Sequence, residues 1–423
     1  MNTVALTPEE QAMLDGREGE GVAMSMRIVV RLAEAMGASG LLAISGAHID
    51  SCLYHGQSGL DFVHRLRQGR AAVQVPTTLN VSSLDLLHPE LYVGDADEAA
   101  KSHLLMDAYV SLGCEPTWTC APYQREQRPG FGDHVAWAES NAIVFANSVL
   151  GARTHRYGDF IDIAAAVTGR VPHAGLHLEE NRRATIVVDV SELPGALLRS
   201  DVLYPCLGFL IGRHCPDQIP AIIGLSPEAT ESNLKALGAA AASSGNLAMF
   251  HAVGITPEAP TLEDATGGLH VDSIAFDPAD IRTVRDALSS DADRPLATVS
   301  LGTPHYGIDE IGLLHDELAG AAIAPHVACY VSTARETLHE AMLHGWVAAL
   351  REAGVTFVTD TCTYITPIVK DTTGLAMTDS AKWAYYAPGN IGVEAVFGSL
   401  AECVASAIAG RVIRHENFWI VDD

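Results

Sequence analysis

The sequence predicts an α/β protein with largely parallel sheets. Short apolar segments of strand length recur along the chain, and most are followed by turn residues and then by a helical pattern. These segments are mainly apolar, as in strands buried on both faces of a parallel sheet. In such sheets ligands bind beyond the carboxyl ends of the strands. The predicted strands are residues 40–45, 71–76, 184–190, 220–225, 247–254, 296–302, 326–332 and 355–361.

The amino-terminal residues predict the start of a helix. Thr7 is placed to be the N-cap, Pro8 the first helical residue and Glu10 the partner in a capping box. No basic region followed by an apolar core precedes them, so no signal peptide is expected. Further along, a helical pattern covers residues 333–354.

A helix is also predicted after residue 139, with Ser140 or Glu139 as its cap and Gly151 as its stop. The N–H groups around Asn141 could hold a carboxylate, and Arg153 could clamp the same group with two hydrogen bonds. The alternative interpretation is a capped core helix followed by a surface arginine.

Another short helix is predicted to begin at Asp379 or Ser380 and to stop at the Pro388–Gly389 pair. Lys382 lies in its first turn, where the helix dipole opposes its charge but where it could meet an anionic ligand; the alternative is a surface lysine. A second, glycine-led helix is predicted over residues 389–410.

Two strand-to-loop exits could contact a substrate. The hydroxyl-rich loop at residues 75–85 carries Thr77, Thr78 and Asn80, which could bind a polar substrate or simply form turns. In the exit at residues 300–310, His305 is interpreted as a structural histidine rather than a base.

Size and charge exclude several classes of protein. With 423 residues, 48% of them hydrophobic and 18% charged, the chain should form two or three domains with large cores. A formal net charge of −26 argues against nucleic acid. The longest apolar runs, such as residues 206–212, are too short to span a bilayer, so a soluble cytoplasmic protein is expected.

The eight cysteines should be reduced in that compartment, and no C-x-x-C motif pairs them. Three of them, Cys206, Cys329 and Cys403, lie inside apolar runs and are predicted to pack in the core; Cys215 is left open. The others lie in loops or at strand ends, where a shared metal site could form: Cys52, Cys114, Cys120 and Cys362.

Several motifs together resemble those of one family. In order they are AHID, PTTLN, GCEPTWTCAPYQ, ESNAIVFANSVLGARTHRYGD, DTCTYITPI and TDSAKWAYYAPG. They are similar to the large-subunit region of aconitase X over almost the whole chain. The resemblance implies an aconitase-like, multi-domain α/β/α fold with largely parallel sheets. Clusters of Pro, Gly and Asp place domain boundaries near residues 195 and 295. The predicted regions are residues 1–195 with Cys52 and Cys114, 196–295, and 296–423 with Cys362 and carboxyl-terminal helices, with the domains interleaved.

The resemblance also implies an iron centre. Cys114 and Cys362 match cysteine positions of the family's iron site, whereas Thr303 stands where many members have a cysteine. Cys52 is the expected third ligand and Cys120 the alternative. The cofactor is then a [2Fe–2S] or [4Fe–4S] cluster or a mononuclear iron. Three thiolates would leave a coordination position for substrate, which a fourth would close.

The family further implies a hydro-lyase acting on a small hydroxy acid. The expected reaction converts cis-3-hydroxy-L-proline to Δ1-pyrroline-2-carboxylate. The swivel domain is absent from this chain, so a small swivel-domain subunit is the expected partner and would carry the base, which leaves the catalytic base unassigned here. Alternatives are a phosphomevalonate dehydratase large subunit, a scaffold subunit without a cluster, and a hydrolase using Cys114 and His134. The expected substrate-binding residues are Thr77, Thr78, Asn80, Ser140, Asn141, Arg153, Ser380 and Lys382.

Overall fold

The structure, a computed structural model, describes residues 4–291 and 293–415. The chain folds into two compact units. One consists of residues 1–84 and 95–183, and the other of residues 85–94 and 184–423. The chain therefore passes from one unit to the other three times. None of the described helices is long and apolar enough to cross a bilayer.

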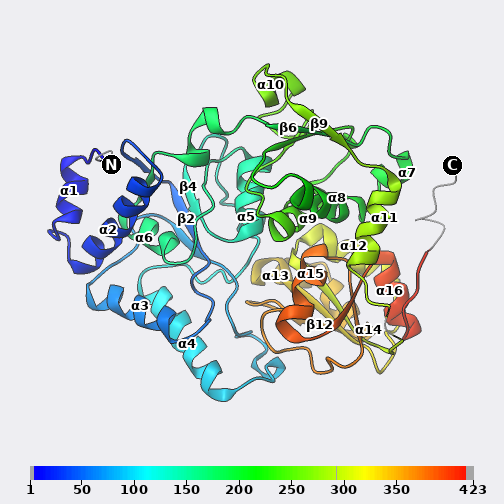
Figure 1. Cartoon of the computed structure of the whole chain (residues 1–423). Coiled ribbons are helices and arrows are strands. Elements are labelled where there is room, and N and C mark those ends of the chain that lie inside the picture. Colours follow the sequence, from blue (N-terminus) through cyan, green and yellow to red (C-terminus); the bar gives the residue numbers. More distant parts are fainter. Residues whose placement is uncertain (1–3, 292, 416–423) are drawn as a thin grey trace. The chain divides into compact units, whose positions relative to one another are not determined.

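The first unit is built on a three-stranded parallel sheet in the order β3-β2-β4, with a separate antiparallel pair of β1 and β5 (Figure 1). Its strands are β1 (Leu41–Ala43), β2 (Gly46–Ile49), β3 (Thr77–Leu79), β4 (Val135–Trp137) and β5 (Arg170–Pro172). Its α-helices are α1 (Pro8–Leu14), α2 (Glu20–Ala35), α3 (Gln57–Gln68), α4 (Ala96–Ser111), α5 (Ser140–Phe145) and α6 (Ile161–Thr168).

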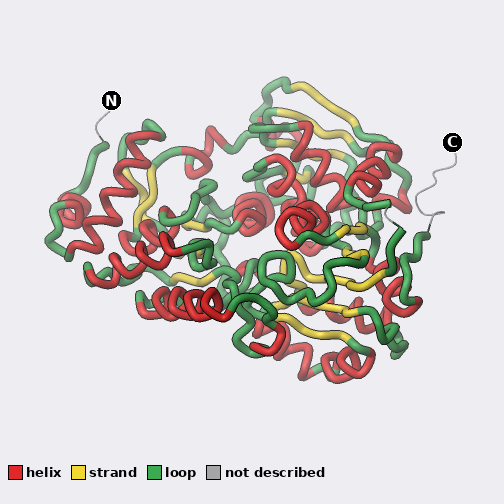
Figure 2. Tube along the Cα trace, turned by 60° about the horizontal axis from the view of Figure 1, so that its bottom comes forward, coloured by secondary structure: helices red, strands yellow, loops and turns green. Residues whose placement is uncertain are grey.

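The second unit contains two fully parallel sheets, of which the smaller has the order β8-β7-β6-β9. Figure 2 shows its strands and those of the other sheets in yellow among red helices. The strands are β6 (Ile186–Asp189), β7 (Pro220–Ile223), β8 (His251–Ala252) and β9 (Asp272–Ala275). The accompanying helices are α7 (Gly195–Leu198), α8 (Leu203–His214), α9 (Glu231–Gly245), α10 (Leu262–Thr266) and α11 (Pro278–Ala287).

The larger sheet has the order β12-β11-β10-β13-β14. Its strands are β10 (Leu296–Tyr306), β11 (Ala328–Thr333), β12 (Val355–Val358), β13 (Leu375–Thr378) and β14 (Glu394–Phe397). Its helices are α12 (Ile308–Leu318), α13 (Arg335–Leu343), α14 (Trp346–Ala353), α15 (Ala381–Ile391) and α16 (Leu400–Ala409). Side chains of α12, α13, α14 and α16 form one apolar core with the strands. The strand order reverses direction between β10 and β13, where open α/β sheets bind ligands.

Helices α8 and α9 lie side by side in the second unit (Figure 1) and approach each other through glycines. A Cβ atom built on Gly208 would lie 2.1 Å from the carbonyl oxygen of Leu237, and one built on Gly245 would lie 1.6 Å from that of Gly212. No real Cβ contact is that short, so the two backbones meet only because these residues lack side chains.

The prediction of a mainly parallel α/β fold is confirmed, since β1 and β5 are the only antiparallel pair of strands among the described residues. The capping box of Thr7 and Glu10 is present, with Pro8 in the first turn. Gly151 ends the predicted helix in the left-handed conformation at φ 66°. Glu139 rather than Ser140 is the cap of that helix.

Four predicted elements are wrong in detail. Residues 71–76 form no strand, because Val73 and Gln74 donate their N–H groups to Leu112 and Ala166. Residues 389–410 form β14 and α16 instead of one helix. Pro388 lies inside α15, which ends one turn later before left-handed Gly392. The pattern over 333–354 divides into α13 and α14 at left-handed Gly345.

Candidate metal and substrate site

Several predicted residues of the second unit gather at the carboxyl edge of its larger sheet. His305 lies at the end of β10, Cys362 in the loop after β12, and Ser380 and Lys382 at the start of the helix after β13. Because all five strands are parallel, their carboxyl ends share one edge. The end of β10 thus meets segments that lie more than 50 residues further along the chain.

The closest potential metal ligands of this edge are His305 and Cys362. Their ligand atoms lie within 4.8 Å of each other, and both side chains are buried. The Nε2 atom of His305 lies 3.0 Å from the carbonyl oxygen of Thr361. Since a carbonyl only accepts, Nε2 carries the hydrogen and Nδ1 is the nitrogen whose lone pair can bind a metal. A metal-binding histidine is commonly oriented by such a bond.

The start of α15 is fixed to the end of β10. Ser380 is the N-cap of this helix, and its Oγ accepts the N–H of Trp383 at 3.1 Å. The same hydroxyl donates to the carbonyl oxygen of Thr303. Lys382, in the first turn, is buried, so its charge acts through a poorly screening environment.

Thr303 also has a side-chain atom that the protein leaves unsatisfied. Its Oγ1 is buried and has no hydrogen-bond partner among the described residues. Buried polar atoms are nearly always paired, so an orphan beside His305 and Ser380 is consistent with a site that receives a ligand. The donor set, a thiol and an imidazole, is also chemically suited to iron.

The first unit has its own polar cluster, at the carboxyl edge of β3, β2 and β4. Glu139 caps α5 by accepting the N–H of Ala142 at 2.8 Å. The carboxylate bound at the start of this helix is therefore the side chain of Glu139. Asn141 is buried and donates to Glu139 and to the carbonyl oxygen of Cys120, at 3.0 Å from the latter. It also accepts a hydrogen bond from Tyr123.

Sequence reasoning missed two members of this cluster, His48 and Asp50, which lie at the end of β2. The amide of Asn80 bonds the carboxylate of Asp50. His48 Nδ1 lies 2.8 Å from the hydroxyl of Thr78, while its buried Nε2 and the Oδ1 atom of Asn80 have no partner among the described residues. The AHID motif contains both missed residues and could have pointed to them.

Burial and charge shape the protonation of these groups. Burial, with the nearby carboxylates of Glu139 and Asp159, raises the pKa of Asp50 to about 7. Burial lowers the pKa of His48 to about 4, so this imidazole is neutral near pH 7. The end of β2 in the first unit therefore carries a neutral imidazole and a carboxyl group that titrates near pH 7.

Cys52 and Cys114 lie in surroundings that disfavour thiolates. The Cys52 thiol donates towards backbone oxygens of Ile49 and Asn80, at 3.4 and 3.5 Å. Burial, helped by Asp50 and Asp162, raises its pKa well above the usual range. Burial and Asp162 also raise the pKa of Cys114. In the metal-free protein both thiols are therefore protonated near neutral pH.

The remaining predicted residues have separate settings. The hydroxyl of Thr77 donates to the carbonyl oxygen of Val75 at 2.8 Å. The backbone of Arg153 pairs with that of His134, the residue before β4, so Arg153 lies at the amino end of this strand. Ser140 follows the carboxyl end of the same strand. The guanidinium of Arg153 lies 3.5 Å from the carboxylate of Glu179.

A histidine network lies next to Arg153. The Nδ1 atoms of His134 and His177 are 3.0 Å apart, and His177 Nε2 is 2.6 Å from the hydroxyl of Tyr157. Burial, together with the neighbouring His134 and His155, lowers the pKa of His177 to about 3. This ring is therefore neutral in the folded protein, and it becomes an ordinary titrating histidine on unfolding.

Between pH 6.5 and 3 only the unfolded state should bind this proton, so the His177 contribution to stability should decline as pH falls. We expect the stability advantage of the wild type over His177→Gln to shrink by about 2 kcal/mol from pH 7 to pH 5. Urea unfolding at both pH values measures it. His103→Gln, at an exposed histidine of α4 outside this network, is the control substitution. Identical slopes for the wild type and His177→Gln would contradict the assignment.

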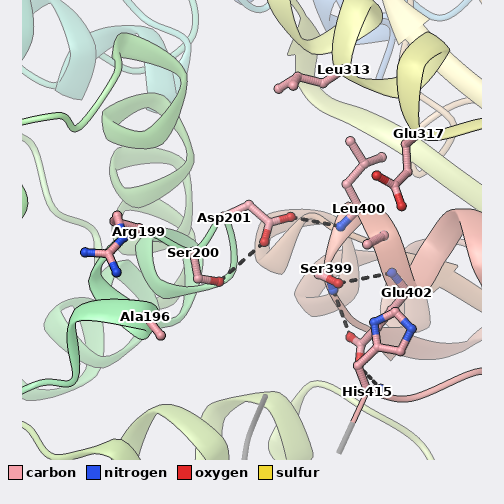
Figure 3. Close-up of a pocket in the computed structure, with 11 residues that line it drawn as sticks. Ala196, Arg199, Ser200, Asp201, Leu313, Glu317, Ser399, Leu400, Glu402 and His415 are labelled. Carbon is pink, nitrogen blue, oxygen red and sulfur yellow. Dashed lines mark hydrogen bonds between the residues drawn. The ribbon is translucent and has the colours of Figure 1, made fainter. Parts of the chain in front are cut away.

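One cavity, of about 490 Å³, lies at the start of α16 (Figure 3). Several of its polar groups form hydrogen bonds with one another. Asp201 accepts the N–H of Leu400 at 2.9 Å, while Ser399 and Glu402 form a capping box. None of the predicted site residues lines it.

The fold and these sites define the class of the protein: an α/β protein whose polar side chains and potential metal ligands come from the carboxyl ends of parallel strands. Models of three aconitase X domains match the chain, the first over residues 3–180, the second over 184–286 and the third over 296–409. The chain belongs to the aconitase X family.

Relatives within the family are dehydratases. The chain is 40% identical to the cis-3-hydroxy-L-proline dehydratase of Pseudomonas aeruginosa, over 98% of this chain and 72% of that protein. It is 38% identical to the phosphomevalonate dehydratase large subunit of Methanothermobacter thermautotrophicus, over 93% of this chain and 96% of that one. A crystal structure of Thermococcus kodakaraensis aconitase X in its holo-form superposes with a TM-score of 0.86 at 30% identity, covering 96% of this chain and all of that one. The predicted family and enzyme class are confirmed.

Proposed function

We propose that this chain is the large-subunit part of an iron-dependent hydro-lyase that acts on cis-3-hydroxy-L-proline. The carrying observation is the buried His305–Cys362 pair at the sheet edge that also holds Lys382, in a chain 40% identical to a dehydratase of that substrate. The reaction removes the α-hydrogen and the 3-hydroxyl group as water. The resulting enamine tautomerises to Δ1-pyrroline-2-carboxylate.

Cys362 and His305 are the proposed iron ligands from the second unit. When bound, the iron supplies Lewis-acid assistance to departure of the hydroxyl group. From the first unit, Cys114 and Cys52 were predicted and Cys120 was the alternative. The thiol of Cys52 donates towards backbone oxygens, so from the first unit we propose Cys120, whose carbonyl oxygen accepts the amide of Asn141 at the start of α5. The cofactor is an iron–sulfur cluster or a mononuclear iron.

Lys382 is the proposed partner of the substrate carboxylate. Its burial strengthens attraction to an anion, and the hydroxyl of Ser380 keeps the start of its helix in place. From the first unit, Asn80 and Asn141 offer amides, and Thr77, Thr78, Ser140 and Arg153 complete the proposed set. Each of these side chains already has a protein partner that a substrate would have to replace, for example the carbonyl oxygen of Val75 for Thr77 and the carboxylate of Glu179 for Arg153.

The base is assigned to no residue of this chain. We place it on a small swivel-domain subunit, because the archaeal relatives are named large subunits. The proposed site of action is the cytoplasm, which suits eight cysteines that form no disulfide. The second candidate reaction is dehydration of phosphomevalonate, favoured by relatives of 31 to 38% identity.

The test is an assay of the chain purified without oxygen, alone and with a co-expressed small swivel-domain subunit. We expect bound iron and turnover of cis-3-hydroxy-L-proline. Its kcat/KM should be at least about 100-fold above that for phosphomevalonate, because a phosphate group in a site shaped for the smaller substrate would leave buried polar groups unpaired. The reverse ratio would favour the second reaction. A chain free of iron and inactive on both substrates, in both preparations, would favour a scaffold subunit.

A further inference from the structure

The loop that presents Cys362 leaves β12 in an unusual conformation. Asp360 lies in the left-handed region at φ 63°, which residues other than glycine rarely adopt, and its side chain is completely buried. A buried carboxylate in such a backbone conformation is costly unless the surroundings stabilise both features.

Arg335, the first residue of α13, supplies that stabilisation. Its Nε and Nη2 atoms lie 2.6 Å from the two carboxylate oxygens of Asp360, which is the two-pronged geometry that arginine forms best. Arg335 follows β11, the neighbour of β12 in the sheet. The ion pair therefore connects the loops that follow two adjacent strands.

A second carboxylate holds the same loop from another side. Asp85 accepts the N–H and the hydroxyl of Thr359, at 2.8 and 2.9 Å, while Asp360 accepts the N–H of Leu86 at 3.0 Å. All these residues belong to the second unit. Two consecutive loop residues are thus fixed just before the metal-binding position.

The loop in turn orients both proposed iron ligands. The carbonyl oxygen of Thr361 accepts the Nε2 hydrogen of His305, and the carbonyl oxygen of Cys362 accepts the N–H groups of Ile365 and Thr366 at 3.1 Å each. A shift of Asp360 would move Thr361 and Cys362 together. It would change both the tautomer-setting bond of the imidazole and the position of the thiol.

We propose that Arg335 and Asp360 are positioning residues that hold Cys362 and His305 in metal-binding geometry. The inference rests on the proposed function for its metal, but the fixed loop itself does not depend on that metal. Neither residue is expected to touch substrate or iron. Their effect should therefore reach the metal site only through the loop.

One measurement needs no metal: the rate at which iodoacetamide labels Cys362 in the metal-free full-length chain, read by peptide mass mapping. We expect at least a ten-fold faster rate in Arg335→Met and Asp360→Gly, and an intermediate rate in Arg335→Lys, which keeps the charge but not the two-pronged geometry. Glycine adopts the left-handed conformation of residue 360 without strain, so Asp360→Gly removes only the side chain. A faster labelling rate in this variant would therefore be due to loss of the carboxylate. Cys329, buried in the neighbouring strand β11, is the internal control and should not change.

The second measurement is cobalt(II) binding to the same chains, followed by thiolate-to-cobalt charge-transfer absorption. We expect a ten- to hundred-fold weaker affinity in Arg335→Met than in the wild type, as for other groups that orient metal ligands. Unchanged Cys362 labelling in both variants, or equal acceleration at Cys329, would overturn the positioning role. If the variants label faster at Cys362 but even the wild type binds no cobalt, the role of the loop stands. The result would then contradict the metal site of the proposed function.

Discussion

Replacement of Cys362 by serine is expected to abolish iron binding and to reduce dehydratase activity by about 10³-fold or more, since loss of even one preorganised group at a reacting centre costs 10²–10³-fold. The thiolate is the strongest donor of the proposed set, and a serine hydroxyl does not ionise near neutral pH. Iron per chain and kcat/KM, measured on protein prepared without oxygen, give the two readouts.

Cys215→Ser is the matched control, because Cys215 is buried at the end of α8 and belongs to no proposed site. It should keep both iron and activity. The same assay separates the ligands from the first unit: Cys120→Ser should resemble Cys362→Ser, whereas Cys114→Ser and Cys52→Ser should retain iron. Retention of full iron by Cys362→Ser would remove the central element of the proposed site.

Substitution of Gly208 by alanine is expected to lower the free energy of unfolding by about 3 kcal/mol, the upper part of the usual range for overpacking. The new methyl group would meet the Leu237 backbone at 2.1 Å, and a helix backbone cannot move aside as a flexible side chain can. Gly245→Ala should act in the same way through Gly212. Thermal and urea unfolding curves would measure the loss.

Gly59→Ala is the control for these substitutions. Gly59 also lies inside a helix, α3, but a Cβ atom there would have no neighbour within 4 Å. Alanine should be neutral or should stabilise by up to about 1 kcal/mol, because it restricts the unfolded chain. Equal destabilisation by Gly208→Ala and Gly59→Ala would mean that α8 and α9 are not in close contact.

The sequence predicted the fold class well, because buried parallel strands are recognisable as apolar runs. It failed where tertiary pairing overrides local pattern. Residues 394–397 continue a helical pattern by composition, yet they pair with β13 as an edge strand. Pro388 was expected to stop a helix, but in the last turn of α15 it removes only one backbone hydrogen bond.

The site was predicted in part for a similar reason. Cys362 was placed at the end of a predicted strand and in a family motif, and Ser380 at the start of a predicted helix. His305 was interpreted as a structural histidine of the exit at residues 300–310, and its neighbour Cys362 is far away in sequence. The raised pKa of Asp50 could not be recognised from the sequence, since it depends on burial and on Glu139. Such properties exist only after folding.

The three passages of the chain between its units have a consequence for biosynthesis. Asp85 leaves the ribosome early, but Thr359, whose N–H and hydroxyl donate hydrogen bonds to it, is 274 residues further along. Residues 85–94 therefore lack this partner until most of the remaining chain has been translated. A fragment ending at residue 183 would carry residues 85–94 without their counterpart, so cutting the gene at that point should not yield two independently folding pieces.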